Sequence, residues 1–153
     1  MGTHYKGNKR EELVLDAFIK LMRASHAIPS RQYHQLSEVG LTNSQFGVLE
    51  ALYHLGPLNQ RTLGKKILTS EGNITFIIDN LVKKELVTRR RDPQDRRRSI
   101  IELTSKGREF IKSYFPTHLS YIMKEFEDFS EEELQEFARL AKKAGINPKQ
   151  SDQ

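Results

Sequence analysis

The segment Thr88–Arg98 contains the residues with the clearest chemistry in this sequence. Six arginines lie in these eleven residues, in triplets at 89–91 and 96–98. A guanidinium is planar, permanently charged and rich in N–H donors, so it suits phosphate and narrow-groove contacts. A run of charge alone would favour the alternative, a loop exposed to water. Arginine in place of lysine, on a short and rigid segment, favours nucleic-acid binding.

The residues beside these arginines predict two strands. Residues 86–88 and 99–103 are rich in β-type side chains, and Asp92-Pro93-x-Asp95 lies between them. This pattern favours a turn because proline presets φ and aspartate side chains accept hydrogen bonds from nearby amides. We therefore expect a β-hairpin with a basic tip. Helical patterns lie on both sides, which is the outline of a winged helix-turn-helix with the hairpin as the wing.

The elements before the hairpin should be helical. Residues 11–27 have apolar residues at helical spacing, and Pro29 is expected to break or kink this helix before residues 30–38 continue it at an angle. Thr42 and Gln45 form a capping-box pattern for a second helix that Gly56 ends. Asn59 can cap a short third helix, and a fourth runs to about Lys84. The third helix should carry Leu63, Ile67 and Leu68. On the fourth, the residues expected to face inward are Ile74, Ile77, Ile78, Leu81 and Val82.

The C-terminal part should add two more helices. Thr104 caps a fifth helix that Pro116 is expected to interrupt or kink, and Ser130 with Glu133 opens a sixth. The terminal helices carry more apolar surface than one winged domain can cover, so they should pack together and against a second copy. A larger monomeric core is the alternative. We expect a mainly α single domain over residues 1–153, with a winged core at about 42–104 and dimerisation helices at about 8–38 and 104–145.

Composition narrows the function. The net charge is +5 and the sequence pI about 9.5. Residues 61–112 contain 14 Lys and Arg against 7 Asp and Glu, whereas residues 124–139 contain 7 acidic and 2 basic residues. One basic region and one acidic element are typical of a nucleic-acid binder. The absence of cysteine excludes disulfides and thiol switches, and without an apolar leader or span we expect a cytoplasmic protein.

Catalytic and metal-binding patterns are missing from the sequence. The five histidines lack metal-ligand spacing, and no nucleophile–base set or phosphate-binding glycine loop occurs. The acidic run 131–133 opens a helix, where the macrodipole favours negative charge. The sequence therefore predicts no enzyme activity, no metal site and no cofactor.

Three segments together resemble the MarR family. These are Asp92-Pro93-x-Asp95-x-Arg97 with residues 99–107, residues 63–81, and Gly40-Leu41-Thr42 with residues 46–49. The resemblance covers roughly residues 10–145. It implies a homodimeric bacterial transcription regulator, usually a repressor, that binds two adjacent half-sites of double-stranded DNA. One departure is Glu85, where the family commonly has glycine; a positive φ there would cost about 1 kcal/mol or more.

The resemblance also implies residue roles. Arg97 would enter the minor groove, with Asp95 fixing its side chain. Early residues of the recognition helix would face the major groove: Asn73 could contact an adenine or bond the turn, Thr75 is balanced between DNA contact and structure, and Phe76 could contact a thymine methyl or join the core. The DNA-binding candidates are Ser70, Asn73, Thr75, Phe76, Arg89, Arg91, Asp95, Arg96, Arg97 and Arg98. Further phosphate candidates are Lys65, Lys66, Lys83, Lys84 and Arg90.

A small aromatic or phenolic effector that lowers DNA affinity is also implied by the resemblance. The residues expected at its pocket, between the dimerisation helices and the winged domain, are His26, Tyr33, His34, Phe46, Phe115 and His118. Ordinary core packing is the alternative for each of them. A protein- or RNA-docking module and a regulator without a ligand remain alternative functions.

Overall fold

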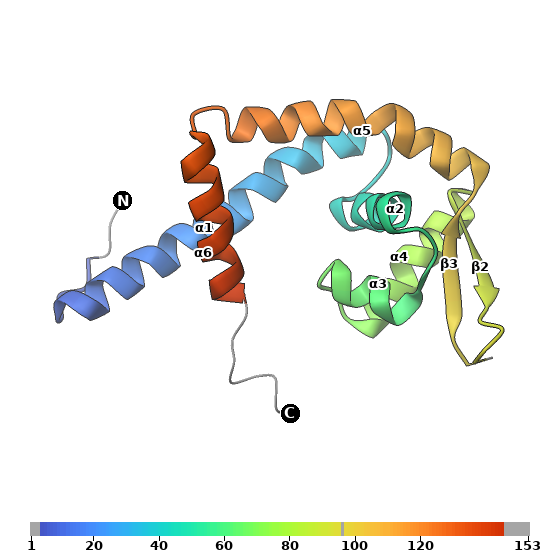
Figure 1. Ribbon diagram of the computed structural model, residues 1–153, viewed down its shortest axis with the longest axis horizontal. Helices are drawn as coiled ribbons and strands as arrows, with labels where there is room; N and C mark the ends of the chain where they lie inside the picture. Colours follow the sequence, from blue (N-terminus) through green and yellow to red (C-terminus); the bar gives the residue numbers. More distant parts are fainter. Residues whose placement is uncertain (1–3, 96, 146–153) are drawn as a thin grey trace. The chain divides into compact units, whose positions relative to one another are not determined.

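A computed structural model describes residues 4–95 and 97–145 of the chain. Contacts divide the chain into two compact units, residues 1–117 and 118–153, with the boundary inside one helix. In the first unit, helices and a small sheet form the predicted winged helix-turn-helix (Figure 1). The expectation of a mainly α winged fold is confirmed. No helix in these described residues is long and apolar enough to cross a membrane.

Helix α1 spans Lys9–Glu38 and passes through Pro29 without ending. Asn8 caps it in a capping box with Glu11. The predicted break at Pro29 is therefore wrong, although the predicted continuation to Glu38 is confirmed. Proline removes one backbone donor, but tertiary contact holds this segment, since Asn43 Nδ2 donates to the Pro29 carbonyl oxygen at 2.9 Å.

Helices α2 and α3 begin at the predicted caps, and α4 begins at a cap that was not predicted. Helix α2 (Asn43–Leu55) has the Thr42–Gln45 capping box and ends at Gly56, whose φ is 77°. Asn59 caps α3 (Gln60–Lys66), and Ser70 caps α4 (Glu71–Lys83). The sequence predicts a turn over residues 69–72, but residues 71 and 72 already belong to α4, so the turn is shorter than predicted.

The sheet is antiparallel in the order β1-β3-β2. Strands β2 (Val87–Arg91) and β3 (Ser99–Leu103) form the predicted hairpin, with Arg89 opposite Ile101. Strand β1 (Leu58–Asn59) pairs with Ile101 and Ile100 and was not predicted. This short strand fixes the start of α3 against the base of the wing.

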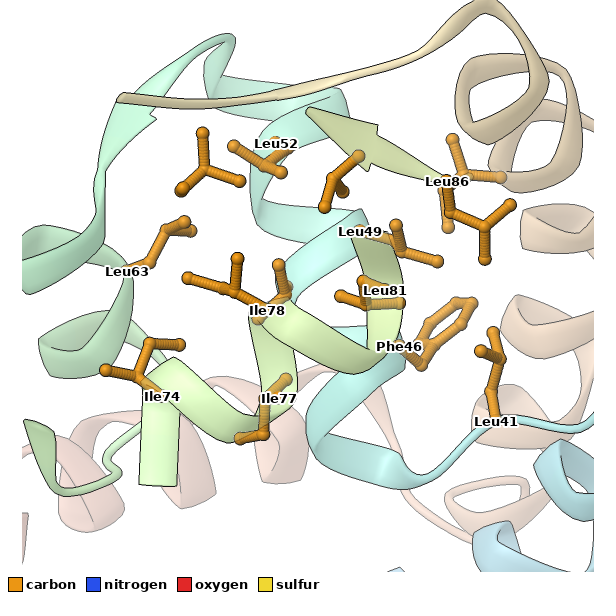
Figure 2. Close-up of a cluster of buried hydrophobic side chains, with 14 of the residues drawn as sticks. Leu41, Phe46, Leu49, Leu52, Leu63, Ile74, Ile77, Ile78, Leu81 and Leu86 are labelled. Atoms are coloured by element: carbon orange, nitrogen blue, oxygen red, sulfur yellow. The ribbon is translucent and has the colours of Figure 1, made fainter. Parts of the chain in front are cut away.

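The apolar core lies between α2, α3, α4 and the sheet (Figure 2). Val82 was predicted to face inward but is 39% exposed, so this assignment is wrong. Leu68 was predicted to lie on the third helix, which ends at Lys66, and it is 93% exposed. Leu68 lies beyond the end of α3 at φ 54°, which turns its side chain out of the helix pattern. The fully buried side chains include Leu49, Leu52, Leu63, Ile74, Ile78, Leu81 and Ile101.

Helix α5 (Ser105–Glu125) begins where the wing returns to the core. Thr104 caps it through a hydrogen bond from the Gly107 N–H at 2.9 Å. A Cβ on Gly107 would lie 1.9 Å from the Leu86 carbonyl oxygen, so only glycine allows this close approach. The helix is continuous through Pro116, and the predicted interruption there is wrong.

Helix α6 (Glu131–Gly145) lies in the second unit. Ser130 and Glu133 form the predicted capping box, at 2.9 and 3.2 Å. Hydrogen bonds from its own backbone and from the Ser130 hydroxyl lower the pKa of Glu132, which favours the charged form at this helix start. Phe126, Phe129 and Phe137 form an aromatic cluster within this unit, with ring centroids 5.5–6.1 Å apart.

Candidate nucleic-acid interface

The tip of the wing is closed by the two aspartates of the predicted turn. The Asp92 N–H donates to the Arg98 carbonyl oxygen at 3.0 Å, and the Arg98 N–H donates to that of Asp95 at 2.8 Å. The Asp92 carboxylate accepts from the Gln94 N–H at 2.9 Å. These bonds make the tip a compact turn on which arginines are held at fixed backbone positions.

Asp95 contacts two of the arginines. Its Oδ1 lies 3.3 Å from Arg97 Nε and accepts the Arg97 N–H at 3.0 Å, and its Oδ2 lies 3.3 Å from Arg98 Nε. The expected Asp95–Arg97 contact is therefore present. The Arg97 side chain is 91% exposed, whereas that of Asp95 is 27% exposed. The carboxylate orients the guanidinium and leaves it available to an external anion.

The other wing arginines differ in their surroundings. Arg89 Nη2 lies 2.7 Å from Asp79 Oδ1, which ties the wing strand β2 to helix α4. Arg90 Nε lies 3.4 Å from Glu102 Oε1 on β3. Arg91 is exposed. Arg96 lies outside the described residues. Arg89 and Arg90 thus form ion pairs with carboxylates of the same chain, in addition to any contact with nucleic acid.

The expected recognition helix α4 presents one side of its first two turns to solvent, opposite the buried Ile74 and Ile78. The Ser70 hydroxyl caps the helix by accepting the Asn73 N–H at 3.3 Å. The Asn73 side chain donates to the Thr69 hydroxyl, so it bonds the turn while remaining exposed. Phe76 is 67% exposed and does not belong to the core, so contact with a thymine methyl group is the role that remains of the two expected for it.

Thr75 is held by two hydrogen bonds that the sequence did not suggest. Gln60 Nε2, on α3, donates to Thr75 Oγ1 at 2.7 Å. Thr75 Oγ1 lies 3.1 Å from the Glu71 carbonyl oxygen, to which it donates. The hydroxyl is therefore oriented from both helices of the helix-turn-helix.

A cleft of about 600 Å³ lies between the wing and helices α3 and α4. The cationic side chains on its lining outnumber the carboxylates, so it should attract anions. Thr75 and Gln60 also line it, which brings the expected base-reading helix and the wing tip to one concavity. The charged residues on the lining are Arg61, Lys65, Arg97, Arg98, Glu71 and Asp95.

The remaining phosphate candidates are lysines on exposed positions. Lys65, Lys66, Lys83 and Lys84 are all exposed, and Lys65 lines the cleft. At the end of α4, Lys106 Nζ donates to the Lys84 carbonyl oxygen at 3.0 Å.

Only part of the predicted effector set lines one cavity. His26, Tyr33 and His34 line a cavity of about 350 Å³ beside the start of α2. Phe46 is buried against Tyr114 in the core, and Phe115 contacts His54, with ring centroids 5.0 Å apart. His118 is buried and begins the second unit. Within the described residues, no group of three or more His, Asp or Glu is placed to hold a metal ion.

Asn43 was missed by the sequence analysis and lines the same cavity as His26. Its Nδ2 donates to the Pro29 carbonyl oxygen, but its Oδ1 is buried and accepts no hydrogen bond from the part of the chain described. A buried acceptor without a donor is unfavourable by about 1–3 kcal/mol. A ligand that brings a hydroxyl or N–H group would remove that cost.

Comparisons with known proteins agree with this geometry. A family model described as MarR family matches residues 41–99. The HTH-type transcriptional regulator MhqR of Bacillus subtilis (strain 168) is 37% identical over 139 residues, covering 91% of this chain and 96% of MhqR.

Solved structures share the fold. The MepR–DNA complex of S. aureus has a TM-score of 0.73 and 26% identity, covering 84% of this chain and 96% of MepR. Bordetella bronchiseptica BpsR, described with a mechanism by which 6-hydroxynicotinic acid regulates its DNA binding, has a TM-score of 0.77 and 23% identity, covering 85% of this chain and 98% of BpsR.

Proposed function

Because the chain belongs to the MarR family of winged helix-turn-helix transcriptional regulators, we propose that it represses genes as a homodimer on a pseudo-palindromic DNA operator. Family members bind DNA and are regulators, not enzymes. The observation that carries this proposal is the cleft that α4 and the arginines of the wing line together. An α-helix fits the major groove of B-DNA, and arginine suits the adjacent narrow groove.

The DNA contacts divide between two elements in this proposal. Asn73, Thr75 and Phe76 on α4 face the edges of bases, and Arg97 enters the minor groove with Asp95 orienting it. Ser70 stays at the cap of α4. The remaining arginines, Arg89, Arg91, Arg96 and Arg98, contact phosphates, with Arg89 also holding the wing to Asp79. Base contacts then specify the operator while phosphate contacts fix the register.

A homodimer is proposed because the terminal helices leave apolar side chains exposed. On α1 these are Leu13, Val14, Phe18, Leu21 and Met22, and in the second unit they include Met123, Leu134, Phe137 and Leu140. Large exposed apolar patches are typical of interaction surfaces, and most oligomers are symmetric dimers. A dimer also presents two winged units, as a palindrome requires.

The effector we propose is a small phenolic or aromatic compound bound at the cavity beside Tyr33. His26 and His34 suit a phenolate or carboxylate, and the buried Asn43 Oδ1 needs a donor such as a phenol hydroxyl. BpsR indicates that this fold can respond to an aromatic acid. The effector must bind the DNA-incompetent dimer better, by about 5 kcal/mol for a full shift.

Selection of bound fragments from the source genome, followed by footprinting, tests the DNA proposal. We expect protected half-sites about one helical turn, or roughly 10 base pairs, apart. Bound DNA without twofold symmetry, or preferential binding of RNA or of a protein, would favour a docking module and contradict the proposal.

A DNA-release screen of salicylate-like, phenolic and quinone compounds tests the effector. We expect one compound class to release DNA at millimolar concentration or below. Tyr33→Phe, Asn43→Leu and His34→Ala change residues that line this cavity and should weaken the response, with Gln135→Ala on α6 as the control. A ligand-independent regulator would show no release, and a response unchanged in all three variants would place the effector elsewhere.

A further inference from the structure

We propose that Gln60 is a positioning residue for base readout, because its amide fixes the Thr75 hydroxyl so that Thr75 offers DNA a methyl group and one acceptor lone pair, but no proton. This inference rests on the proposed DNA-binding function. It predicts that the base pair facing Thr75 is A·T and that G·C is disfavoured there.

The hydrogen bonds around Thr75 assign its proton. A hydroxyl has one proton and two lone pairs. The Glu71 carbonyl oxygen, 3.1 Å away, can only accept, so it takes the single proton of Thr75. Gln60 Nε2, at 2.7 Å, donates to one lone pair. Both contacts are satisfied together only when Gln60 presents its NH₂ group, and one lone pair of Thr75 then remains.

The position of Thr75 on α4 directs this remaining lone pair toward the cleft. Ile74, Ile77 and Ile78 face the core, so Thr75 lies on another face of α4. It lines the cleft together with Arg97 of the wing. A β-branched side chain has few χ1 rotamers, and two hydrogen bonds restrict it further. The methyl group and the free lone pair therefore have defined positions.

The major-groove edges of the base pairs differ in how they match such a group. An A·T pair offers the N6 amino donor of adenine and the methyl group of thymine. At a G·C pair the N4 amino group of cytosine is also a donor, but guanine N7 and O6 are two acceptors that would face the Thr75 lone pair without an intervening proton. The G·C pair also has no methyl group. An acceptor beside a methyl group on the protein therefore matches A·T better than G·C.

Gln60 is needed because a hydroxyl can otherwise rotate about its Cβ–Oγ1 bond. Without the amide donor, the Thr75 proton can leave the Glu71 carbonyl and point to a guanine acceptor. Selectivity against G·C would then fall even though Gln60 itself contacts no base. The two residues are 15 positions apart in sequence and belong to different helices, so the effect depends on the folded helix-turn-helix.

The experiment is selection of duplexes from a randomised library by the full chain, read by sequencing. The variants are Gln60→Met, which keeps the side-chain length without the amide, Thr75→Val, which keeps the shape without the hydroxyl, and the double variant. Gln135→Met on the exposed face of α6 makes the same chemical change elsewhere. Base preference is a ratio within one variant, so a loss of overall affinity does not change it, and thermal melting checks folding.

We expect one position in each half-site at which the wild-type chain and Gln135→Met prefer A·T over G·C by about fivefold or more, the lower end of a mismatch cost. Gln60→Met, Thr75→Val and the double variant should each reduce this ratio to about twofold or less, without additivity, because both residues act through one hydroxyl.

Three results would overturn the inference. The first is an A·T preference that Thr75→Val removes but Gln60→Met leaves unchanged. The second is an A·T preference that Thr75→Val leaves unchanged. The third is a preference for G·C at this position in the wild-type chain. Failure of the wild-type chain to enrich any sequence would instead overturn the proposed function, and this inference with it.

Discussion

The winged core and the terminal helices differ in how they treat apolar side chains. Leu49, Leu63 and Ile78 are fully buried within one chain, whereas Phe18 on α1 is 57% exposed. Burial of apolar surface stabilises a fold by about 25 cal/mol per Å². The winged core therefore obtains its packing from one copy of the chain, while α1 keeps exposed apolar side chains that the proposed dimer would bury. Stability and assembly should accordingly respond to different substitutions.

Ile78→Ala tests the winged core, which packs within one copy of the chain, and it should have the largest effect. Ile78 is fully buried between α4 and its neighbours, so truncation removes contacts and leaves a cavity. We expect a loss of roughly 2–5 kcal/mol in the free energy of unfolding. Urea denaturation at fixed protein concentration measures it. Val82→Ala, four residues later on the same helix and half-exposed, is the control and should cost less than about 1.5 kcal/mol; equal losses would show that the core is not packed as described.

Phe18→Ala tests the terminal helices, through the exposed apolar face of α1. We expect the dimer dissociation constant to rise about 30-fold or more, since aromatic anchors at interfaces contribute about 2 kcal/mol or more. Sedimentation over a concentration series measures it. Lys20→Ala removes only an exposed pair with Asp16 and should change the constant less than about fivefold. A wild-type chain that is monomeric at micromolar concentration would contradict the dimer itself.

Local signals predicted most of the fold. Caps at Thr42, Asn59 and Thr104 could be predicted because each bond joins residues a few positions apart. Strand β1 has two residues, too few for a hydrophobic period, and its pairing depends on a distant strand. Pro29 lies inside a helix because contact with α2 outweighs its local preference, which no local pattern reveals.

The contacts of the candidate site also divide into a contact within one turn, which was expected, and contacts between separate elements, which were not. The Asp95–Arg97 contact was implied by the family resemblance, and its two residues lie in one turn. The Gln60–Thr75 and Arg89–Asp79 contacts were missed, since each joins different elements, and Asn43 was missed because its unsatisfied oxygen depends on burial. The family resemblance put the geometry at Glu85 in question, because glycine is common there, and the structure has a positive φ of 60° at this position.

Arg97→Ala should affect DNA binding without affecting the packed core. We expect a loss of roughly 1–3 kcal/mol in operator binding per half-site, typical of a groove contact, and a smaller loss for Asp95→Ala, which removes only the orienting group. Fluorescence anisotropy across a salt titration measures both. Arg139→Ala on α6, whose guanidinium is paired with Glu136, is the matched control. Wild-type affinity in both wing variants at every salt concentration would show that the wing assignment is wrong.

The smallest expected effect concerns the backbone between α4 and the wing. A left-handed conformation costs an L-residue roughly 1–2 kcal/mol, and Glu85 and Leu68 have φ 60° and 54°. Glu85→Gly removes that cost, but it adds chain entropy to the unfolded state and removes the exposed pair with Lys106, at 2.9 Å, so we expect a net gain below about 1 kcal/mol. Glu85→Ala keeps the strain and loses the pair, so it should be about 1 kcal/mol less stable than Glu85→Gly.

Leu68, between α3 and α4, has the same backbone conformation. Leu68→Gly should gain more stability than Glu85→Gly, because the Leu68 side chain is 93% exposed and has little packing to lose. Chemical denaturation of the three variants measures these differences, and Glu85→Gly less stable than Glu85→Ala would mean that the side chain, and not the backbone, decides this junction.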